Sequence, residues 1–257
     1  MDNGYKSTAV ILTAVEVETV SIKSQFGDWK HIAATGDSQD YYETTLTSNH
    51  GEEMRIITAQ QKVMGMTACT MLAAKAIHLF RPKYLIMSGI AAGTSDTTSH
   101  MYGDVIVPDI IWDYTTGKYV GPDESEIRFG DIGFLPRPVS IRIDNQIMDK
   151  VRSTIGAPDN EFHIHIGPMA CGSCVVANEE VVEKQIKAMF PQTIGLDMES
   201  YSLCFAAENA SEPRPLSIVV KSICDYANAE KDDRFQKFAA FNSAGYVHYL
   251  LTNHLEA

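Results

Sequence analysis

The chain has 257 residues, of which 45% are hydrophobic and 21% charged, a composition typical of a globular protein with a sizeable core. Its formal net charge of -12 argues against a nucleic-acid-binding protein, because such a protein needs a basic surface to displace counterions from phosphates. No apolar run reaches the roughly 18 residues of a membrane span, and the first residues lack signal-peptide features, so we expect a cytoplasmic protein without membrane contact.

Apolar periodicity in the first half of the chain predicts alternating strands and helices. In chain order, we expect a strand at 8–12, a helix at 16–22, a β-hairpin at 40–48 and 53–60, a helix at 67–80 and a buried strand at 84–87. The strand at 84–87 leads into Ser88-Gly-Ile-Ala-Ala-Gly93, which we expect to be a loop whose small residues let a ligand approach the backbone. This segment is neither a dinucleotide fingerprint nor a phosphate-binding P-loop.

The second half continues the α/β pattern after one long interruption. In chain order, we expect strand structure at 102–114, an excursion loop at 115–140 that could cover a site, a helix at 147–155, a strand at 162–167, helices at 178–190 and 198–208, a strand at 216–224 and a helix at 238–255. The excursion is rich in glycine, proline and charge. No repeat or linker-like stretch divides the chain.

Acidic residues stand where apolar segments give way to polar ones. Asp225 comes at or just past the end of the β-branched run 216–220, and strand ends are where α/β folds place their chemistry. Glu18 lies near the start of the predicted helix at 16–22. Capping is the alternative interpretation of both residues, since a carboxylate favours a turn or a helix N-terminus.

Two further patterns favour structural roles over chemical ones. His163 and His165 point to one face of a strand, but no obvious third metal ligand lies nearby, so we interpret them as surface residues. Cys171 and Cys174 have the spacing of a redox pair, yet no basic residue nearby would acidify the first thiol. We therefore interpret these cysteines as small buried residues that line a pocket. The odd total of five cysteines also fits a reducing compartment better than a disulfide framework.

Four groups of residues together resemble a known family. They are Ala14-Val-Glu-Val-Glu18, Ser88-Gly-Ile-Ala-Ala-Gly93 with Gly103-Asp-Val-Ile-Val107, Asp197-Met-Glu199, and Ile223-Cys-Asp225. In this order and spacing they resemble the purine nucleoside phosphorylase and nucleosidase superfamily, most closely its methylthioadenosine/S-adenosylhomocysteine nucleosidase-like branch. The likeness covers nearly the whole chain, which we therefore expect to form one domain over residues 1–257. It implies a three-layer α/β/α sandwich around a mixed, partly barrel-closed sheet, and a homodimer or larger homo-oligomer.

The resemblance also implies roles for individual acids. Asp225 would hydrogen-bond the purine at N7 and supply the leaving-group proton, Glu199 would bind the ribose hydroxyls with Met198 against the sugar, and Glu18 would position and activate water. A glycosidic C–N bond breaks with positive charge on the sugar and negative charge on the base, so this division of labour is chemically sound. To act as an acid, Asp225 must hold a proton near neutral pH, which burial would favour. No metal or cofactor is required.

Smaller residues are expected to complete the substrate site. Beside Glu199 and Met198, these are Ile90, Ala91, Val175, Val176 and Cys224. Ile90 stands where the methylthioadenosine enzymes commonly have a hydroxyl residue, and Val175 stands where an aromatic ring usually stacks on the base. Loss of that ring could cost on the order of 1 kcal/mol of binding, which would alter affinity but not reaction type. The base preference and the 5′ substituent remain open.

Water is favoured over phosphate as the nucleophile. Phosphorolytic relatives hold phosphate with arginines near the N-terminus and before the strand-end glycines, but residues 13–18 and 86–91 contain no basic residue. Glu16 and Glu18 would instead repel a dianion. We therefore expect a purine nucleosidase acting on a small-molecule nucleoside. A phosphorylase of the same fold and a non-catalytic nucleoside-binding module are the alternatives.

Overall fold

The computed structural model describes residues 4–95, 98–120, 128–129, 132–229 and 233–257. The strands are β1 (Ser7–Thr13), β2 (Lys30–Ala33), β3 (Asp40–Thr47), β4 (Glu53–Gln60), β5 (Pro82–Gly93), β6 (Val105–Asp113), β7 (Gly117–Val120), β8 (Arg128–Phe129), β9 (Ile132–Pro136), β10 (Val139–Arg142), β11 (Ile164–Cys171), β12 (Gly195–Asp197) and β13 (Leu216–Asp225). The helices are α1 (Glu16–Phe26), α2 (Met66–Phe80), α3 (Asn145–Thr154), α4 (Glu179–Val181), the π-helical η1 (Val182–Lys187), α5 (Ser200–Glu208) and α6 (Gln236–Asn253).

A mixed sheet forms the middle layer of the protein. Along its main path the strand order is β10-β6-β11-β12-β5-β1-β4-β3-β2. β13 pairs in parallel with β5 and antiparallel with β6, while β12 joins β11 to β5. The strands β5, β12, β11, β6 and β13 therefore close into a ring, which confirms the expected mixed and partly barrel-closed sheet.

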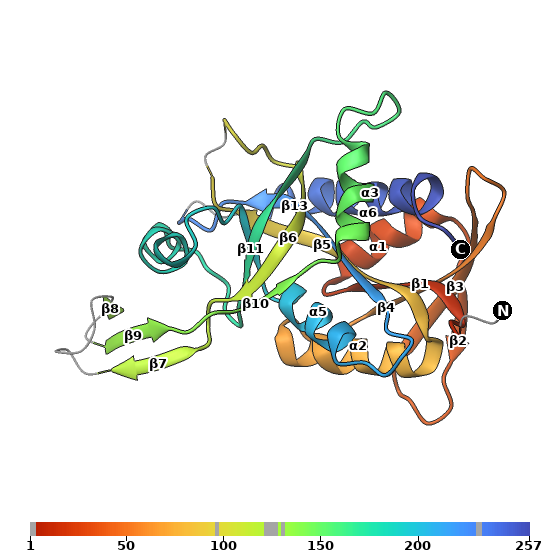
Figure 1. Cartoon of the computed structure of the whole chain (residues 1–257), viewed down its shortest axis with the longest axis horizontal. Coiled ribbons are helices and arrows are strands. Elements are labelled where there is room, and N and C mark those ends of the chain that lie inside the picture. Colours follow the sequence, from red (N-terminus) through yellow and green to blue (C-terminus); the bar gives the residue numbers. More distant parts are fainter. Residues whose placement is uncertain (1–3, 96–97, 121–127, 130–131, 230–232) are drawn as a thin grey trace.

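Helices cover both faces of the sheet. α1, α3 and α6 lie on one side and α2 and α5 on the other (Figure 1). Every residue of β1 is buried, as expected for a strand that runs through the centre of a sheet covered on both faces. The largest apolar cluster joins the central strands to both helical layers. This three-layer arrangement confirms the predicted fold class.

Most of the predicted elements are present, but two predicted loops were wrong. Residues 88–93 continue β5 as a strand, because their small side chains let neighbouring strands approach closely. The excursion at 115–140 contains β7, β8 and β9, an antiparallel sheet that projects from the main body (Figure 1). Residues 121–127 and 130–131 of this excursion lie outside the described residues.

Two further differences concern the segment before α5. The predicted helix at 178–190 begins as expected at Asn178, whose side chain accepts a hydrogen bond from the Glu180 N–H, but it continues as the π-helix η1. The short strand β12 was not predicted. It has three residues, too few to show a strand period in the sequence. Within the described residues, no helix is both long enough and apolar enough to span a bilayer.

Candidate active site

A cavity of about 430 Å³ opens where β1, β5, β12 and β13 end. All nine residues that we predicted for the site line this cavity. They are Glu18, Ile90, Ala91, Val175, Val176, Met198, Glu199, Cys224 and Asp225. The structure therefore brings together residues that lie more than 200 positions apart in the sequence. Their individual roles are taken up below as proposals.

Glu18 is held rigidly at the floor of the cavity. It lies in the first turn of α1 and is only 2% exposed. One of its oxygens accepts the N–H groups of Ala14 at 2.7 Å and Val15 at 3.2 Å, and the other accepts the N–H of Ile90 at 2.9 Å. A carboxylate has about four acceptor positions, so these three bonds leave room for one more donor. Glu18 can thus hold one small donor such as water in a fixed place.

Glu199 is a buried carboxylate at the other side of the cavity. Its Oε1 accepts the N–H of Gly65 at 2.8 Å, at the start of α2, and the side-chain amide of Gln61 at 3.2 Å. Burial raises the pKa of Glu199 above its ordinary value, although the nearby ammonium of Lys221 acts in the opposite direction. The second oxygen, Oε2, is 3.8 Å from that ammonium and faces a cavity that could admit hydroxyl donors.

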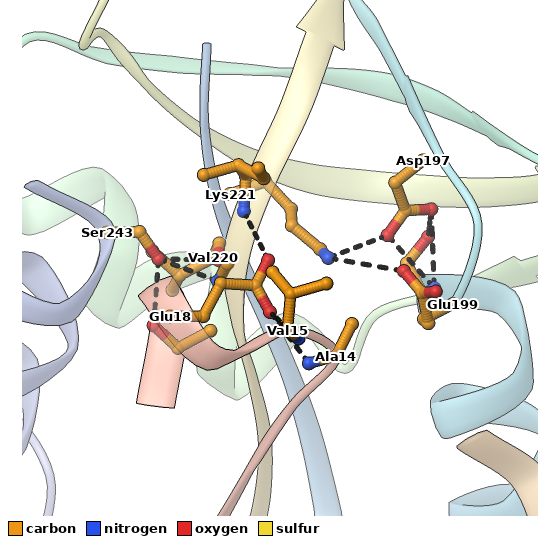
Figure 2. Close-up of polar contacts among 12 residues, drawn as sticks. Ala14, Val15, Glu18, Asp197, Glu199, Val220, Lys221 and Ser243 are labelled. Atoms are coloured by element: carbon orange, nitrogen blue, oxygen red, sulfur yellow. Dashed lines mark hydrogen bonds and ion pairs between the residues drawn. The ribbon is translucent and has the colours of Figure 1, made fainter. Parts of the chain in front are cut away.

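Lys221 is the residue that sequence reasoning missed. It lies in the middle of β13 with no exposed surface, and its Nζ is 3.1 Å from Oδ2 of Asp197. Figure 2 shows the lysine reaching toward Asp197 and Glu199, while Glu18 meets the backbone amides of Ala14 and Val15. The sequence signal was available, because a lysine inside a buried apolar strand needs carboxylate partners.

Lys221 is surrounded by acidic side chains. Burial alone would lower the pKa of this ammonium, but neighbouring carboxylates outweigh burial and raise the pKa above its ordinary value. These carboxylates belong to Asp197, Glu18 and Glu199. The lysine therefore stays protonated and offsets part of the negative charge beneath the cavity. Lys221 does not line the cavity, so its ammonium interacts with the carboxylates of the protein and not with a ligand.

Asp225 is the last residue of β13, as predicted, and it is 3% exposed. Its Oδ1 accepts the N–H of Ala227 at 2.9 Å, and the Cys224 Sγ lies 3.3 Å from its Oδ2. A carboxylate held in this way at the rim of a sheet can present one oxygen to a ligand in the cavity. Capping of a turn and contact with the cavity are both present in this residue.

The apolar wall of the cavity varies in exposure. Ala91, Val176 and Cys224 are buried, Ile90 and Met198 are partly buried, and Val175 is 56% exposed. Val175 lies in the segment that separates this cavity from a second one of about 460 Å³, which also borders Tyr119 and Phe134 of the projecting sheet. The excursion therefore reaches a neighbouring cavity, and its described residues do not line the first one.

The histidine and cysteine patterns have structural explanations in the described residues. His165 lies with its Nε2 2.7 Å from Oδ2 of Asp104, and His163 is farther from the same carboxylate. The part of the chain that is described holds no cluster of three metal-ligating side chains. Cys171 is buried and Cys174 is exposed at the cavity wall, and both are free thiols. Of the two expected features, burial is confirmed for Cys171 only, and a place in the wall of this cavity is confirmed for Cys174 only.

Comparison with known proteins identifies the family. A family model described as the phosphorylase superfamily matches residues 8–251. The protein y4jS of Sinorhizobium fredii, whose own name records no activity, is 30% identical over 241 residues. That match covers 86% of this chain and 55% of y4jS, so the chain spans about half the length of this relative.

Further relatives carry nucleosidase names. A 5'-methylthioadenosine/S-adenosylhomocysteine nucleosidase of Staphylococcus aureus is 24% identical, with 77% of this chain and 82% of the relative covered. The solved nucleosidase of the same name from Neisseria meningitidis, in complex with methylthio-immucillin-A, has a TM-score of 0.76 at 20% identity and covers 96% of this chain and 99% of its own. Futalosine hydrolase of Helicobacter pylori has a TM-score of 0.75 at 21% identity, covering 96% and 97%. These structures confirm the fold.

Proposed function

Because the chain belongs to the phosphorylase superfamily, we propose that it is a purine nucleosidase. As an N-glycosyl hydrolase, it would cleave an adenosine-type nucleoside, of the methylthioadenosine or S-adenosylhomocysteine kind, to free base and sugar. The observation that carries the proposal is the convergence of Glu18, Glu199 and Asp225 on one cavity, where they are 2%, 4% and 3% exposed. Three buried carboxylates are costly to keep unless they serve a ligand or a reaction.

Asp225 is assigned to the leaving base. It stands at the end of β13 with one oxygen engaged by the Ala227 N–H and the other beside the Cys224 thiol. As the glycosidic C–N bond breaks, the bonding electrons move onto the purine. A proton delivered to N7 of the purine neutralises this charge, so the base leaves as a neutral molecule. A positioned proton donor of this kind typically contributes about 10²–10⁴-fold to the rate.

Glu199 and Met198 are assigned to the sugar. The Gly65 N–H and the Gln61 amide hold one oxygen of Glu199, which leaves the other to accept hydrogen bonds from the ribose hydroxyls. Departure of the base would leave a cationic sugar in this cavity, and the carboxylate of Glu199 would stabilise that cation because an anion acts most strongly in a water-poor site. Met198 packs its flexible side chain against the sugar face.

Glu18 is assigned to the water nucleophile. Three backbone N–H groups fix its carboxylate and leave one acceptor position. A water held there would lose a proton to the carboxylate as its oxygen bonds to the anomeric carbon. Lys221, fixed by Asp197, supports this arrangement by offsetting the negative charge of the acids around it.

Water is proposed in preference to phosphate because of the charges that surround the cavity. Its described lining includes Glu16, Glu18, Asp197, Glu199 and Asp225 and has neither lysine nor arginine. The nearby ammonium of Lys221 is already engaged by carboxylates. A phosphate dianion entering this cavity would meet like charge and no free cationic partner among the described lining residues, which is strongly unfavourable in a desolvated site.

Turnover with and without phosphate tests the proposal. The purified protein is incubated with adenosine, methylthioadenosine, S-adenosylhomocysteine, AMP or ATP, and free base is measured by chromatography in phosphate-free buffer and in added phosphate. We expect base release from at least one nucleoside at rates that phosphate changes less than twofold, roughly the precision of the assay. Release that requires phosphate would instead identify a phosphorylase. Tight binding without any release would identify a binding module.

We also propose that one domain carries this activity in the cytoplasm, and that two copies form a homodimer. The family resemblance supports the single domain and the homodimer, and the odd number of five cysteines supports a reducing compartment such as the cytoplasm. Light scattering coupled to size-exclusion chromatography would report a mass near twice the 28.4 kDa of the chain. A mass equal to that of the chain at micromolar concentration would overturn the dimer.

A further inference from the structure

The segment that follows Asp225 has a strained backbone. Ala227 adopts φ 53°, in the left-handed region that residues with a side chain rarely occupy. Its N–H donates to Oδ1 of Asp225 at 2.9 Å, so the residue with this unusual backbone is bonded directly to the carboxylate. Because a left-handed alanine costs free energy, the surrounding structure must hold the segment in place.

Tyr226, between these two residues, is attached to a distant turn. Its hydroxyl donates to the backbone oxygen of His100 at 2.5 Å. Its ring meets the ring of Tyr102 edge to face, with centroids 4.9 Å apart. The ring also lies close to Gly93, where a Cβ would come within 3.2 Å of it. The side chain is therefore fixed at both its ring and its hydroxyl.

The turn at residues 100–104 also holds the strand before Asp225. The Gly103 N–H donates to the Ile223 oxygen at 2.9 Å, and the Ile223 N–H donates to the Asp104 oxygen at 3.0 Å. The side chain of Asp104 closes the turn by accepting the Met101 N–H at 2.9 Å. This turn therefore forms hydrogen bonds with Ile223, two residues before Asp225, and with Tyr226, one residue after it.

His165 ties this turn to β11. Its Nε2 lies 2.7 Å from the carboxylate of Asp104, and its ring is 4.2 Å from the ring of His100. The turn is therefore anchored in the closed ring of strands and does not hang free at the surface. Tyr102 connects the turn to the start of α6, because its ring stacks on Phe235 with centroids 4.0 Å apart.

We propose that the turn at residues 100–104, acting through the hydroxyl of Tyr226, positions the carboxylate of Asp225 for proton transfer to the leaving base. Tyr226 is then a positioning residue, and this role rests on the nucleosidase function proposed above. The physical reason is that a proton donor must lie within hydrogen-bond reach of its target, and a displacement of about 1 Å can cost on the order of 10²-fold in rate. Loss of the hydroxyl contact would weaken the hold on the strained segment at Ala227 and let the carboxylate of Asp225 shift.

The first test removes the hydroxyl and keeps the ring. Tyr226→Phe is expected to lower kcat roughly tenfold and to leave KM within about twofold, because sugar binding by Glu199 is untouched. Tyr5→Phe is the matched control, since the Tyr5 hydroxyl also donates to a backbone oxygen, that of Arg214 at 2.9 Å, away from the cavity. Melting temperatures of the two variants show whether stability differs. An unchanged kcat in Tyr226→Phe would overturn the proposal.

The second test asks whether Tyr226 acts through Asp225. In an Asp225→Asn background the proton donor is gone, so Tyr226→Phe is expected to cause no further loss of kcat. The same fold loss in both backgrounds would overturn the proposal, since it would make the effect independent of Asp225. Wild-type protein that turns over no nucleoside would overturn the proposed function, and the positioning role with it. Active wild-type protein with an unaffected Tyr226→Phe variant would overturn the positioning role alone.

Discussion

The carboxylate of Glu18 occupies the space that the missing side chain of Gly89 leaves open. A Cβ on residue 89 would lie 2.2 Å from Oε1 of Glu18 and 2.6 Å from its carboxyl carbon. Two non-bonded heavy atoms cannot approach so closely. A side chain at position 89 of β5 is therefore incompatible with the observed position of Glu18 on α1. Glycine at this position is therefore required by the close approach of an acid.

The variant Gly89→Ala is expected to push Glu18 out of place. Because three backbone N–H groups hold the carboxylate, it cannot move without losing some of them. We expect kcat to fall at least about tenfold, since the water would be misplaced. Steady-state kinetics measure this effect. Gly167→Ala is the control, because its Cβ would meet only the flexible side chain of Ile194 at 3.1 Å. Equal activity in the two variants would contradict the role of Glu18.

The variant Asp225→Asn keeps the shape of the side chain and removes the transferable proton. We expect kcat to fall by about 10²–10⁴-fold with a small change in KM, as measured by release of free base. Asp113→Asn is the matched control, because Asp113 is a buried carboxylate that caps its own turn, outside the cavity. If Asp225→Asn retained most of the wild-type activity, another group would have to protonate the base.

The variant Lys221→Met is expected to destabilise the fold severely. It leaves the carboxylates of Asp197 and Glu199 buried without their shared cation. Breaking a buried ion pair from one side typically costs about 3–5 kcal/mol. Urea denaturation measures the unfolding free energy. Lys184→Met is the control, since its pair with Glu180 is exposed and such pairs contribute about 0–1 kcal/mol. A similar loss of unfolding free energy in both variants would show that the carboxylates of Asp197 and Glu199 do not depend on Lys221 for stability.

Stability should depend on pH through Glu199. Burial is the largest cause that raises the pKa of this carboxyl above 4.5, so the folded protein binds the proton more tightly than the unfolded chain. The contribution of Glu199 to the unfolding free energy therefore falls as pH rises from about 4.5 through the raised pKa. Relative to Glu199→Gln, the wild type should lose stability over this window. Urea denaturation at several pH values measures the difference, and a difference that grows with pH would contradict it.

The variant Val175→Phe should tighten nucleoside binding. Val175 is 56% exposed at the cavity wall, so a larger ring has room to stack on a bound base. A stacking contact of about 1 kcal/mol corresponds to a roughly fivefold lower KM, with kcat nearly unchanged because the ring acts equally on substrate and transition state. Val139→Phe on β10, exposed to 52%, is the control. An unchanged or higher KM would place the base elsewhere.

Sequence reasoning located the acids because their positions follow simple rules. Asp225 ends a β-branched run, and Glu18 opens a helix directly after a buried strand. Both positions could be read locally. Glu199 also stands where an apolar segment gives way to a polar one, and the resemblance supplied the roles of all three acids. The α/β class followed from the alternation of strand and helix periods.

The features that were missed depend on tertiary contacts. Lys221 interrupts an apolar run, and only the structure brings it next to Asp197. Residues 88–93 look like a loop because they are small, yet the same smallness lets β5 run on between β12 and β13. The projecting strands β7 and β9 pair mainly with each other and not with the main sheet. The burial that gives the strands of the main sheet a periodic pattern of apolar residues is therefore missing from them.

The closed ring of strands separates the position of Asp225 from the shape of the cavity wall. The last residue of β13 is Asp225, whose strand is hydrogen-bonded on both sides, whereas Val175 and Met64 lie in segments without regular structure. Substitutions in those segments can reshape the cavity wall while Asp225 stays in place. If the proposed function holds, descendants of this chain could come to accept other nucleosides without a change in the reaction.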